Sequence, residues 1–266
     1  MSIAFIDSGI GGIPYVLKAR EYLPAERFTY VADTASFPYG ERSPDFVIRS
    51  VSSITEKLIE AFSPRVIVIA CNTASVFALP ILRERFHVPF VGTVPAIKPA
   101  AEVTRSGRIG VLATSRTVGA AYLDELVDEH ATECVIERFA GSQLVDFVES
   151  GGWNAPAADV ERALRPTVEV LKTHDIDTLV LGCTHFIFLQ AHLETLLGSG
   201  ISVVDSRDGV ARRILSLAGS DGESRPERVM QPRDLLYTTG FSPQYEKLAG
   251  HFGFSYAGTL HGKSGQ

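Results

Sequence analysis

A chain of 266 residues with 45% hydrophobic and 21% charged side chains has the composition of a folded protein and is long enough for two domains. The net charge of -6 offers no basic field to attract nucleic acid and does not favour an acidic substrate, so groups that bind such a substrate must be local. The start of the chain lacks the basic and apolar regions of a signal peptide, and the apolar runs are too short to span a bilayer, so we expect no membrane partner.

Short runs rich in Val and Ile alternate along the chain with helical patterns. The predicted strands are Ile3–Ile6, Phe28–Val31, Val66–Ala70, Phe90–Val91, Ile109–Leu112, Val135–Glu137, Thr178–Leu181 and Ser202–Val204. One helix is predicted from Ser43 as its N-cap to about Phe62, with Pro44 as its first residue, and others cover about 115–130, 157–173, 186–197 and 208–218. Strand runs with little polar alternation, separated by helices, predict an α/β fold with mainly parallel sheets flanked by helices.

Two stretches of the sequence resemble each other. A strand of the buried type leads into Cys71-Asn72-Thr73, and another leads into Cys183-Thr184-His185. In both cases a further strand brings a polar residue, Thr93 or Asp205, 22 residues after the cysteine. The repetition predicts two similar domains that each offer one cysteine, with the active site in the crevice between them.

The domain boundaries follow from this repetition. We expect a first domain of residues 1–97 plus 207–266, carrying Asp7 and Cys71, and a second domain of residues 98–206, carrying Cys183 and His185. The last sixty residues are too few for a third domain, so they are expected to return to the first as a helix, a strand at about 234–238 and a final helix. Gly219–Arg233 is rich in Gly, Ser, Pro and charge and is predicted to be a surface loop.

Polar signatures follow five of the predicted strands, where open α/β sheets bind their ligands. They are Asp7-Ser8-Gly9-Ile10-Gly11-Gly12, Asp33 with Pro38-Tyr39-Gly40, Cys71-Asn72-Thr73, Thr93, and Cys183-Thr184-His185, and we expect them to line one crevice. The glycine-rich loop is weak evidence for a phosphate site, because Asp7 would repel phosphate and no Gly-Lys-Ser/Thr follows. We favour its N–H groups and the Ser8 hydroxyl as donors to a small carboxylate, with further neutral donors on Asn72, Thr73, Thr114 and Thr184.

The three cysteines, Cys71, Cys134 and Cys183, are too few and too widely spaced for a disulfide framework, which indicates the reducing cytoplasm. A cysteine between a strand and a helix N-terminus lies at the positive end of the helix dipole, which favours the thiolate. Taken singly, each would more often be a small buried filler. Because Cys71 and Cys183 occupy the same place in two repeated units, we predict that both are functional, with Asp7 or His185 exchanging protons with them. Cys134 has no such neighbours and is predicted to be structural.

These motifs, with Pro95-Ala96-Ile97-Lys98-Pro99-Ala100, resemble those of the glutamate racemase family in order and spacing, over about residues 3 to 215. The resemblance implies an isomerase that supplies D-glutamate for peptidoglycan, with two α/β domains. It implies Cys71 and Cys183 as the two acid/base residues, assisted by Asp7 and His185. The substrate would be surrounded by Asp7, Ser8, Pro38, Tyr39, Gly40, Asn72, Thr73, Thr114, Thr184 and His185. Glu149 resembles a further family carboxylate near the second cysteine, although a solvated helix residue explains it equally well. Ile187 stands where the family often has proline.

Two thiols suit racemisation, because one group removes the α-proton from one face while the other returns a proton to the opposite face. We expect no cofactor. A pyridoxal enzyme needs a Schiff-base lysine, and only Lys98 lies inside a motif, with Pro99 after it. The chain has no Cys-x-x-Cys or His-x-x-x-His pair, so we expect no metal either.

Three alternatives stay open at this stage. The first is an aspartate racemase or a related two-cysteine isomerase or decarboxylase. The second is a cysteine hydrolase, in which one of the two thiols attacks a carbonyl. The third is a non-catalytic two-domain binder of small anions. A homodimer is compatible with the sequence, which does not determine the oligomeric state.

Overall fold

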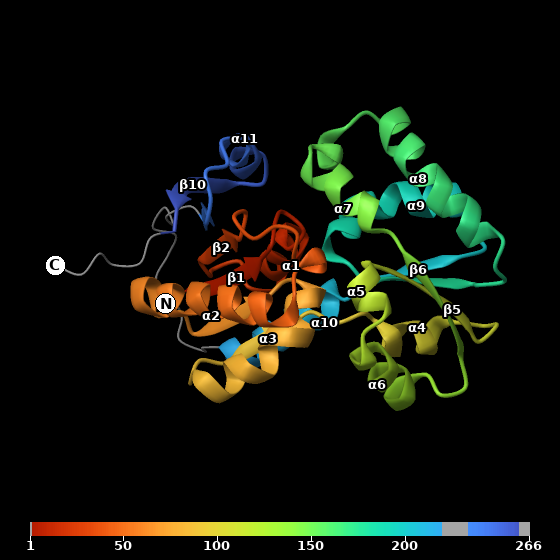
Figure 1. The fold of residues 1–266 in the computed structure, drawn as a ribbon, viewed down its shortest axis with the longest axis horizontal. Coiled ribbons are helices and arrows are strands. Elements are labelled where there is room, and N and C mark those ends of the chain that lie inside the picture. The colour runs from red at the N-terminus through yellow and green to blue at the C-terminus, as the bar shows by residue number, and fades with distance from the viewer. Residues whose placement is uncertain (1, 220–233, 261–266) are drawn as a thin grey trace. The chain divides into compact units, whose positions relative to one another are not determined.

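The computed structural model describes residues 2–219 and 234–260. The chain divides into two compact units (Figure 1). Unit 1 comprises Met1–Thr93 and Arg207–Gln266, and unit 2 comprises Val94–Ser206. Most of the loop predicted at Gly219–Arg233 lies outside the described residues. In the described ranges, no helix combines the length and the apolar character that crossing a membrane requires.

Unit 1 is built on a parallel sheet whose described strands have the order β10-β9-β2-β1-β3-β4. These strands are β1 (Ile3–Asp7), β2 (Phe28–Ala32), β3 (Val66–Ile69), β4 (Phe90–Gly92), β9 (Asp234–Thr238) and β10 (Phe254–Thr259). Every residue of β1, β2 and β3 is buried, which explains why these runs show no polar alternation.

Helices cover this sheet (Figure 1). They are α1 (Ile13–Tyr22), α2 (Pro44–Phe62), α3 (Asn72–Arg85), α10 (Arg207–Ala218) and α11 (Gln244–His251), with a short 3-10 helix, η1 (Tyr39–Glu41). The predicted start of α2 is confirmed, because the Ser43 side chain accepts a hydrogen bond from the Phe46 N–H and Pro44 is the first helical residue. In the core, Val51 and Leu58 of α2 belong to one buried cluster with Ile67 of β3.

Unit 2 has a smaller parallel sheet of order β6-β5-β7-β8. Its strands are β5 (Arg108–Ala113), β6 (Val135–Ala140), β7 (Thr178–Leu181) and β8 (Ser202–Val204). Its helices are α4 (Ile97–Val103), α5 (Ser115–Val118), α6 (Ala121–His130), α7 (Ser142–Glu149), α8 (Ala157–Lys172) and α9 (Gln190–Leu197), with 3-10 helices η2 (Gly152–Asn154) and η3 (Thr184–Leu189). The predicted α/β class with parallel sheets is thus confirmed for both units.

The strand order repeats between the units. Without β9 and β10, the strands of unit 1 lie in the order β2-β1-β3-β4, so the second strand along the chain lies at the edge beside the first, and the third and fourth follow. The strands of unit 2, β6-β5-β7-β8, have the same order. In both, the third strand leads to a cysteine: β3 to Cys71 and β7 to Cys183. The repeated sequence signature therefore corresponds to a repeated topology.

Several elements differ from the sequence-based expectation. The helix expected over about 115–130 is two helices, α5 and α6, interrupted at Gly119 and Ala120. The end of the chain adds β10 after α11, so the returning segment contributes two strands and not one. Helix α3 was not predicted because the residues that it buries are small or polar and give no apolar period.

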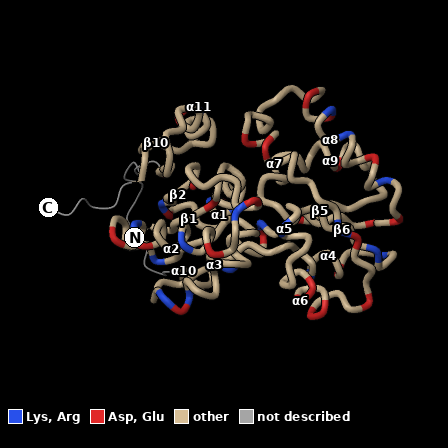
Figure 2. The backbone as a smooth tube through the Cα atoms, viewed as in Figure 1, with Lys and Arg blue, Asp and Glu red and all other residues tan. Residues whose placement is uncertain are grey.

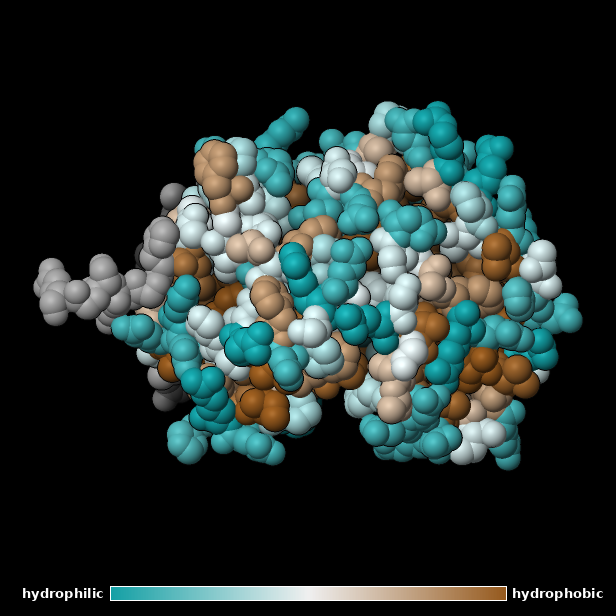
Figure 3. All heavy atoms as spheres, in the orientation of Figure 1, coloured by the Kyte–Doolittle hydropathy of each residue, from teal (hydrophilic) through white to brown (hydrophobic). Residues whose placement is uncertain are grey.

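Charged residues of both signs are interspersed along both units, apart from the acidic helix α6 (Figure 2). On the face that Figure 3 shows, hydrophobic residues form small areas divided by polar ones. Along the backbone drawn in Figure 2, no long run of basic residues interrupts this mixture in the described ranges, in agreement with the net charge of -6.

Asp177, just before β7, accepts four hydrogen bonds that close the turn between α4 and β5. The donors are the Thr104 hydroxyl (2.5 Å), the N–H groups of Arg105 and Ser106 (both 2.7 Å) and the Thr178 hydroxyl (3.0 Å). Burial opposes ionisation, but these hydrogen bonds outweigh it and hold the pKa of Asp177 well below its usual range. A depressed folded-state pKa gives stability that is present above the unfolded pKa, about 3.9, and is lost as the pH falls.

We expect Asp177→Asn to lower the free energy of unfolding of unit 2 by about 1.5–3 kcal/mol at pH 7, because hydrogen bonds to a charged acceptor are lost. The loss should shrink below about pH 4, because there the carboxylate of the unfolded wild-type chain takes up a proton while that of the folded chain stays charged. Fluorescence of Trp153, the single tryptophan, follows unfolding of unit 2. Asp175→Asn, at an exposed neighbouring position, is the matched control. A loss of the same size at pH 7 and pH 3 would contradict this account.

Candidate functional site

The carboxyl end of β1 carries a buried carboxylate and a tightly held glycine-rich loop. Asp7 is fully buried, and its Oδ1 accepts a hydrogen bond from the Ser8 N–H (2.6 Å). The Tyr30 hydroxyl donates to the Gly9 carbonyl (2.6 Å) and accepts from the Gly12 N–H (3.1 Å). A Cβ on Gly12 would lie 2.7 Å from the Cβ of Ala70, which precedes Cys71, so this close approach requires glycine.

Cys71 is the N-cap of α3 and has an extended backbone with φ -140°. It is buried, with 7% of its surface exposed, and Asn72 and Thr73 after it are also buried. The sulfur therefore lies at the N-terminus of a 14-residue helix, where the dipole favours an anion. These positions agree with the sequence-based expectation for the first cysteine motif.

The side-chain amide of Asn72 is a candidate group for binding a polar ligand. Its side chain is 3% exposed, yet within the described part of the chain neither its amide nitrogen nor its amide oxygen has a hydrogen-bond partner. Leaving a buried polar group unpaired costs about 1–3 kcal/mol. A polar ligand that bonds to this amide would recover that cost.

The segment Pro38-Tyr39-Gly40 is held through the Tyr39 phenol. Its hydroxyl donates to Asp33 Oδ2 at 2.6 Å, while Pro38 and Gly40 on either side are half-buried. Burial first, and then the Asp33 charge and hydrogen bond, raise the pKa of Tyr39 well above its usual value. Tyr39 is therefore a neutral hydrogen-bond donor to Asp33.

In unit 2, Cys183 is the N-cap of η3, with φ -136° and 7% exposure, much like Cys71. Its sulfur lies 4.0 Å from His185 Nδ1, and His185 Nε2 lies 3.1 Å from Glu149 Oε2. His185 is 2% exposed, and the Glu149 side chain is 14% exposed. The structure thus places a thiol, an imidazole and a carboxylate in a row, and Glu149 is a partner of His185 and not a solvated helix residue.

In unit 2, a glycine again allows two neighbouring strands to approach closely, here β7 and β5. A Cβ on Gly182, just before Cys183, would lie 2.9 Å from the Cβ of Ala113 at the end of β5. The two following candidate donors are buried. Thr114 is the N-cap of α5, where its hydroxyl bonds Thr117 (3.1 Å), and Thr184 is 2% exposed.

Three residues outside the proposed chemistry have clear structural surroundings. Thr93, which was expected to line the crevice, is fully buried: its hydroxyl donates to the Ile69 carbonyl and its N–H to Ser75 Oγ. These bonds join the end of β4 to β3 and α3, and the expectation that Thr93 lines the crevice stays a prediction. Cys134 packs against the core of unit 2. Ile187, at the position where proline was expected, is buried with 6% exposure.

Sequence reasoning missed one group of residues around Asp33. Besides Tyr39, its carboxylate accepts hydrogen bonds from the hydroxyls of Ser50 on α2 and Thr239 after β9. Ser and Thr hydroxyls so far apart in the sequence carry no recognisable motif. The sequence signal was Asp33 itself, a charged residue directly after a fully buried strand.

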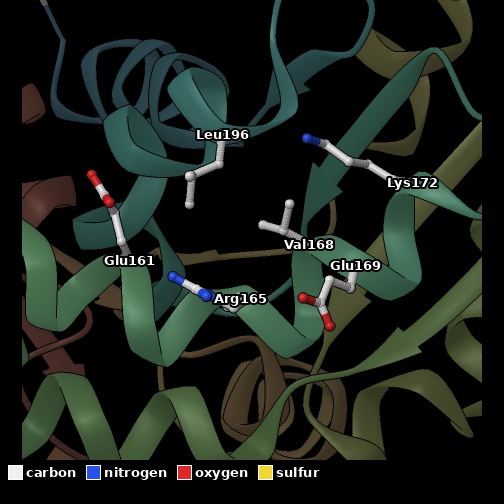
Figure 4. Close-up of a pocket in the computed structure, with 6 residues that line it drawn as sticks. All are labelled: Glu161, Arg165, Val168, Glu169, Lys172 and Leu196. Atoms are coloured by element: carbon white, nitrogen blue, oxygen red, sulfur yellow. The ribbon is translucent and has the colours of Figure 1, made fainter.

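A separate hollow of about 280 Å³ lies between α8 and α9 (Figure 4). Its lining residues are Glu161, Arg165, Val168, Glu169, Lys172 and Leu196. Charges of both signs surround two apolar side chains, and none of the cysteine motifs contributes. Among the residues that the structure describes, no group of three or more His, Cys, Asp or Glu side chains is placed to hold a metal ion.

Comparison with known proteins agrees with this arrangement. Residues 16–214 match the Asp/Glu/hydantoin racemase family. A glutamate racemase from Klebsiella pneumoniae (strain 342) is 40% identical over 262 residues, which cover 93% of this chain and 92% of that protein. The crystal structure of Escherichia coli glutamate racemase, in complex with L-glutamate and the activator UDP-MurNAc-ala, superposes with a TM-score of 0.84 at 35% identity and covers 97% of this chain and 98% of that one. Glutamate racemase from Thermus thermophilus, in complex with beta-chloro-D-alanine, gives a TM-score of 0.75 at 30% identity, with 98% and 97% covered.

The unpaired amide of Asn72 makes a prediction about stability. Asn72→Leu should leave the free energy of unfolding of the ligand-free protein unchanged or raise it by roughly 1–2 kcal/mol, because it removes a buried group without a partner. Ser75→Ala is the matched contrast on the same helix: it removes the acceptor of the Thr93 N–H and should destabilise by about 1–3 kcal/mol. Thermal unfolding without ligand measures both. If Asn72→Leu destabilised the protein as much as Ser75→Ala, the amide would have a partner within the folded chain.

Proposed function

The chain belongs to the Asp/Glu/hydantoin racemase family and acts as a glutamate racemase, and we propose that Cys71 and Cys183 are the two acid/base groups with which it interconverts L- and D-glutamate. It is an isomerase, and its product D-glutamate serves peptidoglycan synthesis and so cell-wall formation and cell shape. The observation that carries the proposal about the thiols is their equivalence. Each is a buried N-cap after the third strand of the same repeated topology.

Racemisation requires a proton to leave one face of the α-carbon and another to arrive on the opposite face. We propose that each thiol serves one face, as the base in one direction and the acid in the other. Two groups of the same type have nearly matched proton affinities, which suits a reaction that must run both ways. Following the family resemblance, Cys71 acts as the base for D-glutamate and Cys183 as the base for L-glutamate.

Unit 1 supplies the surroundings of the first thiol in this proposal. Asp7, buried beside Ser8 at the end of β1, assists proton exchange at Cys71. The unpaired amide of Asn72 supports a role in holding the substrate. The remaining residues proposed to surround glutamate on this side are Ser8, Thr73, Pro38, Tyr39 and Gly40.

Unit 2 supplies different residues around the second thiol. We propose that His185 exchanges a proton with Cys183, and the 4.0 Å between its Nδ1 and the sulfur supports this role. Glu149 accepts or shares the proton on the other ring nitrogen and so fixes the orientation of the imidazole. Thr114 and Thr184 complete the proposed substrate contacts. Glu149 acts through His185 and is a positioning residue.

The α-proton of an amino acid is a very weak acid, so the carbanion must be stabilised as it forms. Fixed hydrogen-bond donors in a site that excludes water achieve this, and each contributes about 3–4 kcal/mol. Buried amides and hydroxyls such as those of Asn72 and Thr184 fit that role. We propose that no cofactor takes part. Lys98, the lysine that lies in a motif, has an exposed side chain on α4 and is unsuited to a buried Schiff base.

Two finer points belong to the same proposal. The three described cysteines are free, and an enzyme that needs two reduced thiols suits the cytoplasm, where we place it. A homodimer is compatible with the proposal. The proposed reaction does not require it, because one chain carries both cysteine motifs.

The two thiols are tested by substitution. The pure protein should convert L-glutamate into D-glutamate, and should turn over aspartate far more slowly. Cys71→Ala and Cys183→Ala should each lower the rate by a factor of at least about 10² to 10⁴, the usual contribution of a general acid or base. Cys134→Ala is the matched control and should leave the rate near that of the wild type.

Each other outcome has a distinct meaning. A near-normal rate in either the Cys71 or the Cys183 variant would refute the two-thiol scheme. Loss in one variant alone, together with hydrolysis of an ester or amide, would indicate a single nucleophile. Faster turnover of aspartate than of glutamate would show that the enzyme is an aspartate racemase.

A further inference from the structure

The segment that follows β9 is bonded closely to the loop that leads from β2 to Pro38-Tyr39-Gly40. The Thr239 N–H donates to the Ala32 carbonyl (3.1 Å), and the Thr239 hydroxyl accepts from the Ala35 N–H (3.1 Å). The Gly240 N–H donates to the Thr34 hydroxyl (3.0 Å). Residues 239–240 therefore hold this loop, although more than two hundred residues separate them in the sequence.

The centre of this contact is the Asp33 carboxylate, which is 1% exposed. Its Oδ1 accepts from the Thr239 hydroxyl at 2.5 Å, and its Oδ2 accepts from the Tyr39 hydroxyl at 2.6 Å and from the Ser50 hydroxyl. A buried carboxylate is stable only when its oxygens are well supplied with donors. Each of the three hydroxyls thus contributes to holding the Asp33 carboxylate in place.

Tyr39 links the carboxylate to the first thiol. Tyr39 and Cys71 belong to the same buried cluster. A negative charge on Cys71 is also among the causes that raise the pKa of Tyr39, which indicates that the phenol is close enough to sense the sulfur. A shift of the Asp33 carboxylate would move the phenol that it holds, and with it the segment from Pro38 to Gly40.

We propose that Thr239 is a positioning residue of the racemase, which fixes the Asp33 carboxylate and through it the Tyr39 segment beside Cys71. This inference rests on the proposed function of Tyr39 and its neighbours in binding glutamate. The Thr239 hydroxyl makes two bonds at once, as acceptor from the Ala35 N–H and as donor to Asp33. The returning segment of the chain is in this way part of the substrate-binding machinery of unit 1.

The test is Thr239→Val in the full chain, which keeps the shape of the side chain and removes the hydroxyl. The Michaelis constant for glutamate should rise about tenfold while kcat falls by less than about threefold, because a displaced binding segment weakens substrate binding more than proton transfer. Thr239→Ser restores the hydroxyl and should restore KM. Thr104→Val in unit 2 is the matched control: its hydroxyl also donates to a carboxylate, that of Asp177, and accepts from a backbone N–H, but it does not contact Asp33, so KM should stay unchanged even if the melting temperature falls.

Ser50→Ala provides a second variant, should Thr239→Val fail to fold, because Ser50 bonds the other oxygen of the same carboxylate. It should also raise KM. A KM within about twofold of wild type in Thr239→Val, or in Ser50→Ala where only that variant folds, would overturn the proposal and leave Thr239 with a role in stability alone. Failure of Thr239→Ser to restore KM would overturn it as well. A wild-type protein that does not racemise glutamate would instead refute the proposed function.

Discussion

Both cysteine motifs depend on a close approach between the carboxyl ends of neighbouring strands. In unit 1 the loop after β1 lies against the residue before Cys71, and only a glycine at position 12 fits beside Ala70. In unit 2 the arrangement is reversed, since Gly182 lies on the cysteine-bearing strand and Ala113 on its neighbour. In both units the contact involves the residue directly before the cysteine, where the chain leaves its strand and enters the helix that the cysteine caps.

The shared backbone carries different chemical surroundings in the two units. Cys183 has a chain of contacts through His185 to Glu149, whereas the motif of Cys71 combines the buried Asp7, the unpaired Asn72 amide and a neutral phenol held by Asp33. The repeated strand order explains the equal placement of the thiols. The neighbouring side chains differ: an imidazole lies beside Cys183, whereas unit 1 has a network of hydroxyls around the Asp33 carboxylate that includes Thr239.

The sequence predicted the structural features that depend on short local patterns of residues. Continuous Val and Ile runs located the strands of both sheets, and Ser43-Pro44 located the start of α2, because buried strands and helix caps have their own compositions. Strand β10 and the role of Thr239 were missed, because they depend on pairing between distant parts of the chain. Glu149 was recognised by resemblance alone, and only its contact with His185 distinguishes it from a solvated helix residue.

Racemisation in deuterated water tests the opposed thiols most directly. If one thiol removes the α-proton and the other returns a proton that has exchanged with solvent, D-glutamate formed early from L-glutamate should carry deuterium at Cα. The remaining L-glutamate should still carry mostly protium, and the same should hold in reverse from D-glutamate. NMR spectra recorded at low conversion measure both. Equal deuterium in recovered substrate and product would contradict the action of Cys71 and Cys183 on opposite faces, even if both proved essential.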